Sequence, residues 1–176
     1  MREGAGKAMT ARLAVGIVLE RRETRHPWQD HAWRVEGLLV GGGPSGGWRP
    51  LESGTGWTRY YAGTLELKLH PDEVPSYRYN LGSRQPALYV ILRRSQGENE
   101  VTPFHVTACP VEAQDYMTGG DEIVEAVVMP PMIVAWLQEY VDRHPVPEAF
   151  VKRSKSAKAG NDPSRRPLSR TRGGEG

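Results

Sequence analysis

Alternation of apolar and polar residues with a period of two fills the first two thirds of this chain and constrains its fold more than any other feature. The pattern is clearest in residues 12–22, 33–40 and 58–70, and this period is that of a β-strand with one face buried. Residues 87–92 are apolar without interruption, which predicts a central strand buried on both faces. Residues 101–108 follow a polar turn and are expected to complete a hairpin. These segments together predict a mostly antiparallel sheet.

The stretch from residue 58 to residue 86 has a less regular pattern. Four side chains are expected to share the buried face of its strand: Tyr61, Leu65, Leu67 and Leu69. Gly63 is expected to bend this strand or to form a bulge in it. Residues 71–86 are rich in turn formers and predict a loop. Three alternating side chains could add a short strand there: Tyr77, Tyr79 and Leu81.

Helix signals begin only after residue 108. Pro110 suits the first position of a helix, Cys109 would be its N-cap, and Gly119-Gly120 ends it. After a strand-like stretch at residues 121–129, Pro130-Pro131 opens a second helix that ends before Pro145. This helix has an apolar stripe along one side, formed by Ile133, Trp136, Leu137, Tyr140 and Val141.

The order of these elements predicts an α+β fold. The expected architecture is a mostly antiparallel β-sheet or partly open barrel, with two helices in the C-terminal half packed on one side. Strand and helix units do not alternate along the chain, which argues against a doubly wound nucleotide-binding fold.

The charge of the chain is divided unevenly. Residues 152–176 hold eight basic and two acidic residues and carry +6, whereas the rest of the chain, with 15 basic and 19 acidic residues, carries −4. The basic segment has almost no apolar side chains to offset the entropy of ordering it. The sequence therefore predicts a disordered leader at residues 1–9, one globular domain at residues 10–151 and a disordered basic tail at residues 152–176.

The single cysteine and the shortness of the apolar runs indicate the compartment. Cys109 stands alone, which excludes an intramolecular disulfide and any metal site built from several cysteines of this chain. The apolar run at residues 13–19 is too short to span a membrane, and charged residues follow it without a cleavage site. We expect a cytoplasmic protein without a membrane span. No histidine spacing indicates a metal site, and no cofactor is implied.

A glycine-rich stretch at residues 41–47 invites comparison with phosphate-binding loops. No Lys-Ser or Lys-Thr pair closes it, and Trp48-Arg49-Pro50 stands where a helix should begin. Phosphate binding is therefore disfavoured.

Cys109 is the one weak candidate for a catalytic residue. The unpaired amides of a helix N-terminus stabilise a thiolate. His105 shares a strand face with Cys109, but a strand rises ~3.3 Å per residue, so the two would lie roughly 13 Å apart, too far for a nucleophile and its base. A small buried cap residue is the favoured interpretation of Cys109.

Aromatic residues gather in the first third of the expected domain, and such residues build interfaces and pockets as well as cores. The candidate binding residues are Trp28, Trp33, Trp48, Trp57, Tyr60 and Tyr61. Lys152 and Arg153, at the start of the basic tail, are added to them. The tail lacks aromatic residues that could stack on bases, so nucleic acid is a disfavoured partner.

Several motifs of the expected domain resemble those of a known family. They are residues 106–116, 121–127, 129–131 and 150–153, together with Trp57 and residues 60–67 and 77–81. Over residues 10–153 the chain resembles a family of bacterial proteins of unknown function, whose genes commonly lie beside those for molybdenum-dependent formate dehydrogenase and its iron–sulfur and chaperone partners. The resemblance implies a role in the maturation or assembly of a molybdopterin enzyme, and it implies no catalytic residue.

The first hypothesis is accordingly a non-catalytic accessory or binding protein, acting in maturation or assembly of a molybdopterin-dependent formate dehydrogenase. Its partner would be a cytoplasmic protein, either a subunit of that enzyme or its chaperone. An alternative is a cofactor-maturation enzyme or sulfur carrier that uses Cys109, which requires an exposed thiol. A nucleic-acid-associated protein with a basic tail is the weaker alternative.

Overall fold

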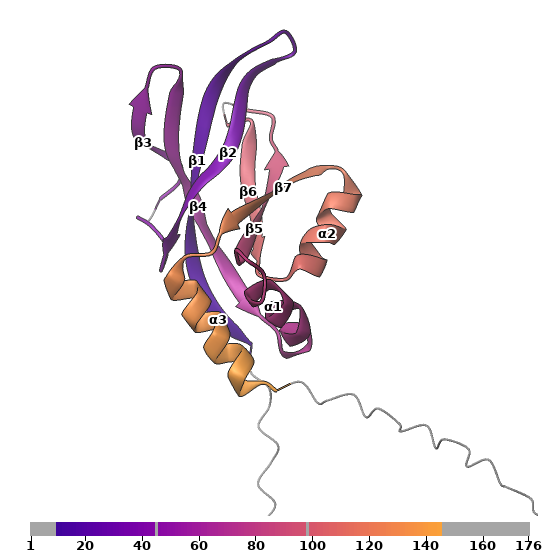
Figure 1. Ribbon diagram of the computed structural model, residues 1–176. Coiled ribbons are helices and arrows are strands. Elements are labelled where there is room, and N and C mark those ends of the chain that lie inside the picture. Colours follow the sequence, from indigo (N-terminus) through magenta and orange to yellow (C-terminus); the bar gives the residue numbers. More distant parts are fainter. Residues whose placement is uncertain (1–9, 45, 98, 146–176) are drawn as a thin grey trace, which may run out of the picture. The chain divides into compact units, whose positions relative to one another are not determined.

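A computed structural model describes residues 10–44, 46–97 and 99–145. The expected leader, residues 1–9, and the expected basic tail, residues 152–176 with Lys152 and Arg153, lie outside the described residues. The described strands form two antiparallel sheets, one of four strands and one of three, and three α-helices accompany them (Figure 1). The predicted fold class is therefore confirmed.

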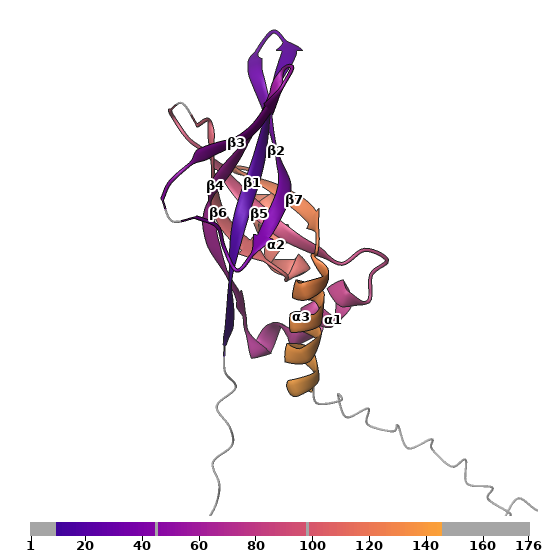
Figure 2. The same cartoon turned by 90° about the vertical axis from the view of Figure 1, so that its left-hand side faces the viewer.

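The four-stranded sheet has the strand order β2-β1-β4-β3. β1 (Ala11–His26) and β2 (Gln29–Val40) form a long hairpin, and β3 (Arg49–Gly54) pairs with β4 (Trp57–Leu69). The tip of the β1–β2 hairpin projects beyond the other strands in both views (Figures 1 and 2). Both strands of this hairpin run further than the apolar pattern predicted, because their outer ends leave the core. β3 was not predicted, since all six of its residues are exposed.

The three-stranded sheet has the order β6-β5-β7, with β5 (Ala87–Arg94) between β6 (Val101–Thr107) and β7 (Glu122–Val128). The predicted central strand is confirmed, because Val90 packs into the main core while its neighbour Ile91 is buried on the opposite face. That opposite face is covered by α2 (Pro110–Gly119), which begins at Pro110 with Cys109 as its N-cap, as predicted.

The main core lies between the two sheets and is closed at one end by helices. β1 and β4 contribute Val15, Ile17, Leu19, Leu67 and Leu69 to it, and β5 contributes Leu88, Val90 and Leu92. α3 (Pro131–Arg143) adds Ile133, Leu137, Tyr140 and Val141 along the predicted stripe. None of the described helices is long and apolar enough to cross a membrane.

Residues 71–86 depart from the sequence prediction of a loop or short strand. A 3-10 turn (η1, Pro71–Glu73) leads into α1 (Val74–Leu81). Tyr77 points into the core from this helix, where its hydroxyl donates to Glu73 at 2.5 Å and accepts from the His70 amide at 3.1 Å. Tertiary contacts of a buried tyrosine thus override its usual preference for strands.

Asn80 fixes the end of α1. Its side-chain amide donates to the carbonyl oxygens of Ala87 at 2.7 Å and Ala108 at 2.8 Å, and its oxygen accepts from the Ala87 amide at 3.0 Å. One buried side chain thereby connects α1 to the start of β5 and to the residue that precedes Cys109.

Tyr61 also departs from the prediction, since it does not share a face with Leu65, Leu67 and Leu69. The pairing of β4 with β1 shifts between Gly16 and Val18, opposite Gly63, which has φ +115°. The expected bulge at Gly63 is therefore real, and it reverses the alternation of side chains. Leu65 points into the core, whereas Tyr61 points to the outer face of the four-stranded sheet, beside Gly16.

Candidate functional site

The predicted aromatic binding residues do not form one surface. Trp33, Trp48 and Tyr60 do meet, with ring centroids 5.7 to 5.8 Å apart, on the core-facing side of the four-stranded sheet. The Arg21 guanidinium lies 5.4 Å from the Tyr60 ring centroid. We call these three rings the aromatic cluster. Trp33 and Trp48 pack against the main core, so the cluster extends that core toward the hairpin.

The polar edge of the aromatic cluster is satisfied by Glu100. The indole nitrogen of Trp33 donates to one carboxylate oxygen at 2.8 Å, and His31 Nδ1 lies 2.9 Å from the other. These hydrogen bonds, from His31 and then Trp33, outweigh burial and hold the pKa of Glu100 below its ordinary value. The cluster is thus held in place by its own contacts, as expected of packing rather than of an empty binding site.

The other three predicted aromatics lie elsewhere. Trp28, at the tip of the β1–β2 hairpin, is 88% exposed. Trp57 lies on the outer face of the sheet, with the Arg59 guanidinium 4.8 Å from its ring centroid. Tyr61 is buried on that face beneath Gly43. Trp28 is therefore the member of the predicted set that is most accessible to a partner.

The glycine-rich stretch explains the burial of Tyr61. A Cβ atom on Gly43 would lie 2.4 Å from the Tyr61 ring, so only glycine permits this close approach. The Gly41 amide donates to the Ala14 carbonyl oxygen at 2.8 Å, and the Gly43 amide donates to Thr64 Oγ1 at 3.3 Å. These hydrogen bonds hold residues 41–43 across the outer face of the sheet, with the amides of Gly41 and Gly43 bonded to protein atoms.

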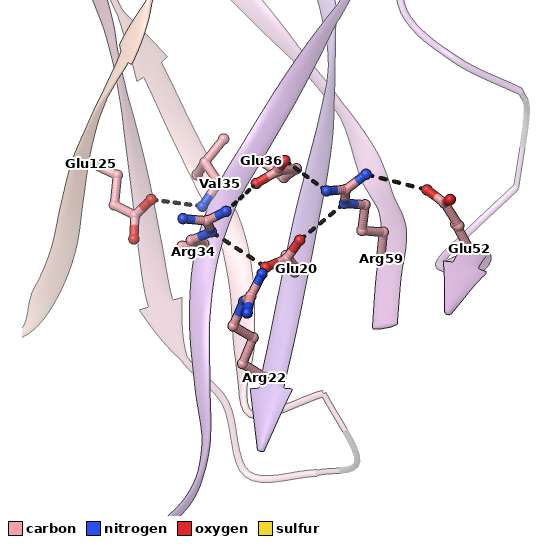
Figure 3. A network of polar contacts seen from close by, with 8 residues as sticks. All are labelled: Glu20, Arg22, Arg34, Val35, Glu36, Glu52, Arg59 and Glu125. Atoms are coloured by element: carbon pink, nitrogen blue, oxygen red, sulfur yellow. Dashed lines mark hydrogen bonds and ion pairs between the residues drawn. The ribbon is translucent and has the colours of Figure 1, made fainter. Parts of the chain in front are cut away.

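A charged cluster covers a further part of this outer face (Figure 3). We call it the outer-face network, and its members come from all four strands: Glu20, Arg22, Arg34, Glu36, Glu52 and Arg59. Glu20 lies at its centre, and the side chain of Glu20 is 0% exposed. The strand register places Glu20 directly opposite both Arg34 and Arg59, so the charges alternate across the strands.

Three guanidinium groups surround Glu20. Arg22 Nε donates at 2.5 Å and Arg59 Nε at 3.0 Å, and Arg34 Nε lies 3.4 Å away. Arg34 and Arg59 also pair with Glu36, at 2.7 and 2.9 Å. Within the network three arginines thus meet three glutamates, and the charges balance.

The electrostatics of Glu20 are those of a structural ion-pair network. Burial alone would raise the pKa of this carboxyl, but hydrogen bonds from Arg22 and Arg59 and the charge of Arg34 outweigh it, so the pKa lies below its ordinary value. Across the described residues, no buried side-chain nitrogen or oxygen lacks a hydrogen-bond partner. The network therefore connects the four strands by ion pairs within the sheet.

Glu125 of β7 makes a different contact beside this network (Figure 3). Its carboxylate accepts a hydrogen bond of 2.6 Å from the Val35 amide on β2, an edge strand of the other sheet. Burial raises the pKa of Glu125, against the opposing effects of that hydrogen bond and of the Arg34 charge. Glu125 thus connects the two sheets by a single hydrogen bond.

The candidate nucleophile is placed at the N-terminus of α2. Cys109 is 3% exposed. Its amide donates to Thr107 Oγ1 at 3.0 Å, and the Glu112 amide approaches its sulfur at 3.5 Å. His105 pairs instead with Glu112, with Nε2 2.8 Å from the carboxylate oxygen. This hydrogen bond outweighs burial and lowers the pKa of Glu112. The thiol is buried, whereas a nucleophile needs exposure and a base, and His105 is paired with Glu112.

An apolar opening lies between α1 and α2. The sequence analysis missed it, because α1 itself was not predicted. The α1–α2 groove has a volume of about 490 Å³ and is lined by Pro75, Ser76, Tyr79, Pro110, Val111, Gln114 and Asp115. Tyr79 is 76% and Val111 61% exposed. Both helices bury their opposite sides, through Tyr77 on α1 and Ala113 on α2, so their apolar residues on the groove side remain open to solvent.

A second, smaller hollow of about 290 Å³ adjoins the α1–α2 groove and is lined by Glu112, Asp115 and Tyr116. Asp115 belongs to both. The described residues contain no group of three or more His, Cys, Asp or Glu side chains that could hold a metal ion.

The described part of the chain is thus an α+β domain of two antiparallel sheets, with an open apolar groove between two short helices. Residues 14–154 match the model of a family described as "Protein of unknown function (DUF3305)". The chain belongs to this family. No curated protein and no solved structure matches it.

Proposed function

We propose that the protein is a non-catalytic accessory protein that binds a partner protein through the α1–α2 groove. The observation that supports this function best is the exposure of Tyr79 and Val111 around that groove. Tyrosine is enriched at the energetic centres of protein interfaces. Exposed apolar side chains grouped around a hollow are typical of interaction sites.

The site chemistry favours binding over catalysis. The sulfur-carrier alternative requires an accessible thiol, and Cys109 is buried beneath the first turn of α2. His105 and Glu112 satisfy each other, and the arginines around Glu20 are occupied by glutamates.

The partner proposed is a cytoplasmic subunit of a molybdopterin-dependent formate dehydrogenase, or the chaperone of that enzyme. The support for this identity is the resemblance of the sequence motifs described above. The groove supports a protein partner in general.

An affinity pull-down with the full chain tests the proposal. The bait is expressed in cells that make a molybdenum-dependent formate dehydrogenase, and bound proteins are identified by mass. We expect the wild type to retain a dehydrogenase subunit or its chaperone, and Tyr79→Ser to lose it. Trp28→Ser, which changes the exposed aromatic of the hairpin, is expected to retain it.

Three outcomes contradict the proposal in distinguishable ways. If Trp28→Ser loses the partner and Tyr79→Ser keeps it, binding occurs at the hairpin, and the proposal that the α1–α2 groove is the binding site is wrong. If both variants bind as the wild type does, neither surface is the interface. If the wild type retains neither protein, the proposed partner is wrong. Both variants should fold as the wild type does, because both side chains are exposed. Urea unfolding of each variant verifies this.

A further inference from the structure

We propose that the α1–α2 groove takes an extended segment of a partner protein that carries a lysine or arginine next to an apolar residue. This inference rests on the proposed function and names the chemistry of its partner. It is based on the combination of apolar walls with an acidic end.

The apolar part of the groove would hold the apolar residue of the segment. Pro75 and Tyr79 stand one turn apart on α1, and Pro110 and Val111 face them from the first turn of α2. Proline and tyrosine walls are rigid and lose little side-chain entropy when a ligand is bound. α1 has 8 residues and α2 has 10, so the groove between them is only about two helical turns long. It can hold a few residues of an extended segment but not a long helix.

The acidic end of the groove would hold the basic residue. Asp115 is exposed, lines both the groove and the smaller hollow beside it, and has no cationic partner among the described side chains. Glu112 lines the same hollow and bonds to His105. The residues that line the two hollows include no lysine or arginine. A partner residue of positive charge would therefore meet uncompensated negative charge beside an apolar surface.

The test selects binders from a random library of short peptides on the immobilised full chain. The best-enriched peptide is then measured by fluorescence anisotropy against the wild type, Asp115→Asn and Tyr79→Ser. Asp30→Asn is the matched control, because it neutralises an exposed carboxylate on β2 that does not line the groove.

We expect the enriched peptides to combine an apolar residue with lysine or arginine. Asp115→Asn should weaken the best peptide about fivefold, the effect of one exposed charge pair, and this weakening should vanish at high salt. Tyr79→Ser should weaken it about thirtyfold or more, as for an aromatic anchor. Asp30→Asn should bind as the wild type does.

The inference and the proposed function fail in different ways. Suppose that Tyr79→Ser weakens binding, but that the enriched peptides lack basic residues or Asp115→Asn binds like the wild type. The groove is then still the binding site, and the inference that its partner carries a basic residue is wrong. If no peptide is enriched, or Tyr79→Ser binds like the wild type, the groove itself is not a binding site and both proposals fall.

Discussion

Replacing Glu20 with Gln removes the central charge of the outer-face network and keeps the size of the side chain. In the wild type this carboxylate is the shared acceptor for Arg22, Arg34 and Arg59. In the variant three guanidinium groups would converge on a neutral amide, which accepts fewer hydrogen bonds. Glu36 and Glu52 would then be the only carboxylates of the network, so one of its three positive charges would be uncompensated. Glu20→Gln should therefore destabilise the sheet without opening a cavity.

The size of the loss follows from how far the arginines can reach water. Removing one partner of a fully buried ion pair costs about 3–5 kcal/mol. Arg22 and Arg34 are 53% and 54% exposed and Arg59 is 31% exposed, so water partly solvates the charges that remain. We therefore expect Glu20→Gln to lower the free energy of unfolding by about 2–3 kcal/mol at pH 7, which corresponds to a fall in Tm of about 10 °C.

The assay is urea unfolding of the full chain, followed by circular dichroism, with Glu66→Gln as the matched control. Glu66 lies on β4 and pairs with Arg12 at 3.1 Å, but both side chains are about half exposed. That variant should lose at most about 0.5 kcal/mol. For both variants the dependence of the unfolding free energy on urea should stay as in the wild type, because the surface exposed on unfolding is unchanged.

The pH dependence of this loss gives an independent check. The folded-state pKa of Glu20 is lowered, so its contribution is fully present above the unfolded pKa and is lost as the pH falls through the folded pKa. The gap between wild type and Glu20→Gln should therefore be constant near pH 7 and shrink below about pH 4. A loss at pH 7 no larger than that of Glu66→Gln, or a gap that widens in acid, would refute the reasoning.

Three further outcomes are expected. Glu125→Gln should be as stable as the wild type, or up to about 1 kcal/mol more stable, at pH 7, because the amide oxygen still accepts the hydrogen bond from Val35. Burial raises the pKa of the Glu125 carboxyl, so the stability that this carboxyl contributes is lost as the pH rises. In urea unfolding, the difference in unfolding free energy between variant and wild type should therefore close in acid. Gly43→Ala should cost about 1–3 kcal/mol, because its methyl group would collide with the Tyr61 ring, whereas Gly47→Ala, which meets open space, should cost almost nothing; equal unfolding midpoints would contradict this. Cys109 should react with a thiol reagent at least about a hundredfold more slowly in the folded than in the urea-unfolded chain, since reaction needs local opening, and fast labelling would restore the sulfur-carrier alternative.

The sequence predicted those elements whose local signals and apolar pattern agree with how the element packs. α2 and α3 carry proline at their first turns, and α3 has a continuous apolar stripe, so local signals and packing agree there. α1 also has a proline in its first turn but has no such stripe. Its position depends on contacts outside the helix, of Tyr77 with His70 and of Asn80 with Ala87 and Ala108. The groove, which needs α1 as one wall, was hidden from the sequence for the same reason.

The outer-face network was equally hidden, although its residues are plain in the sequence. That Glu20, Arg34 and Arg59 are neighbours can be predicted only when the register of three strands is known. A one-residue shift in either pairing would move these side chains to opposite faces. The bulge at Gly63 places Tyr61 on the opposite face in the same way. The sequence predicted a possible bulge there, but which side chains it turns outward depends on the pairing with β1.

The two walls of the groove are held in position by residues that do not line it, so the lining residues are not needed to fix its shape. Asn80 bonds to the backbone of Ala87 and Ala108, which fixes the end of α1 relative to the residue before the N-cap of α2. The spacing of the two walls therefore depends on a buried amide and not on Tyr79 or Asp115, which face solvent. Exposed apolar side chains that contribute little to folding are unfavourably hydrated, and binding of a partner would remove that apolar surface from water. For the same reason, we expect changes at these two positions to leave the fold intact.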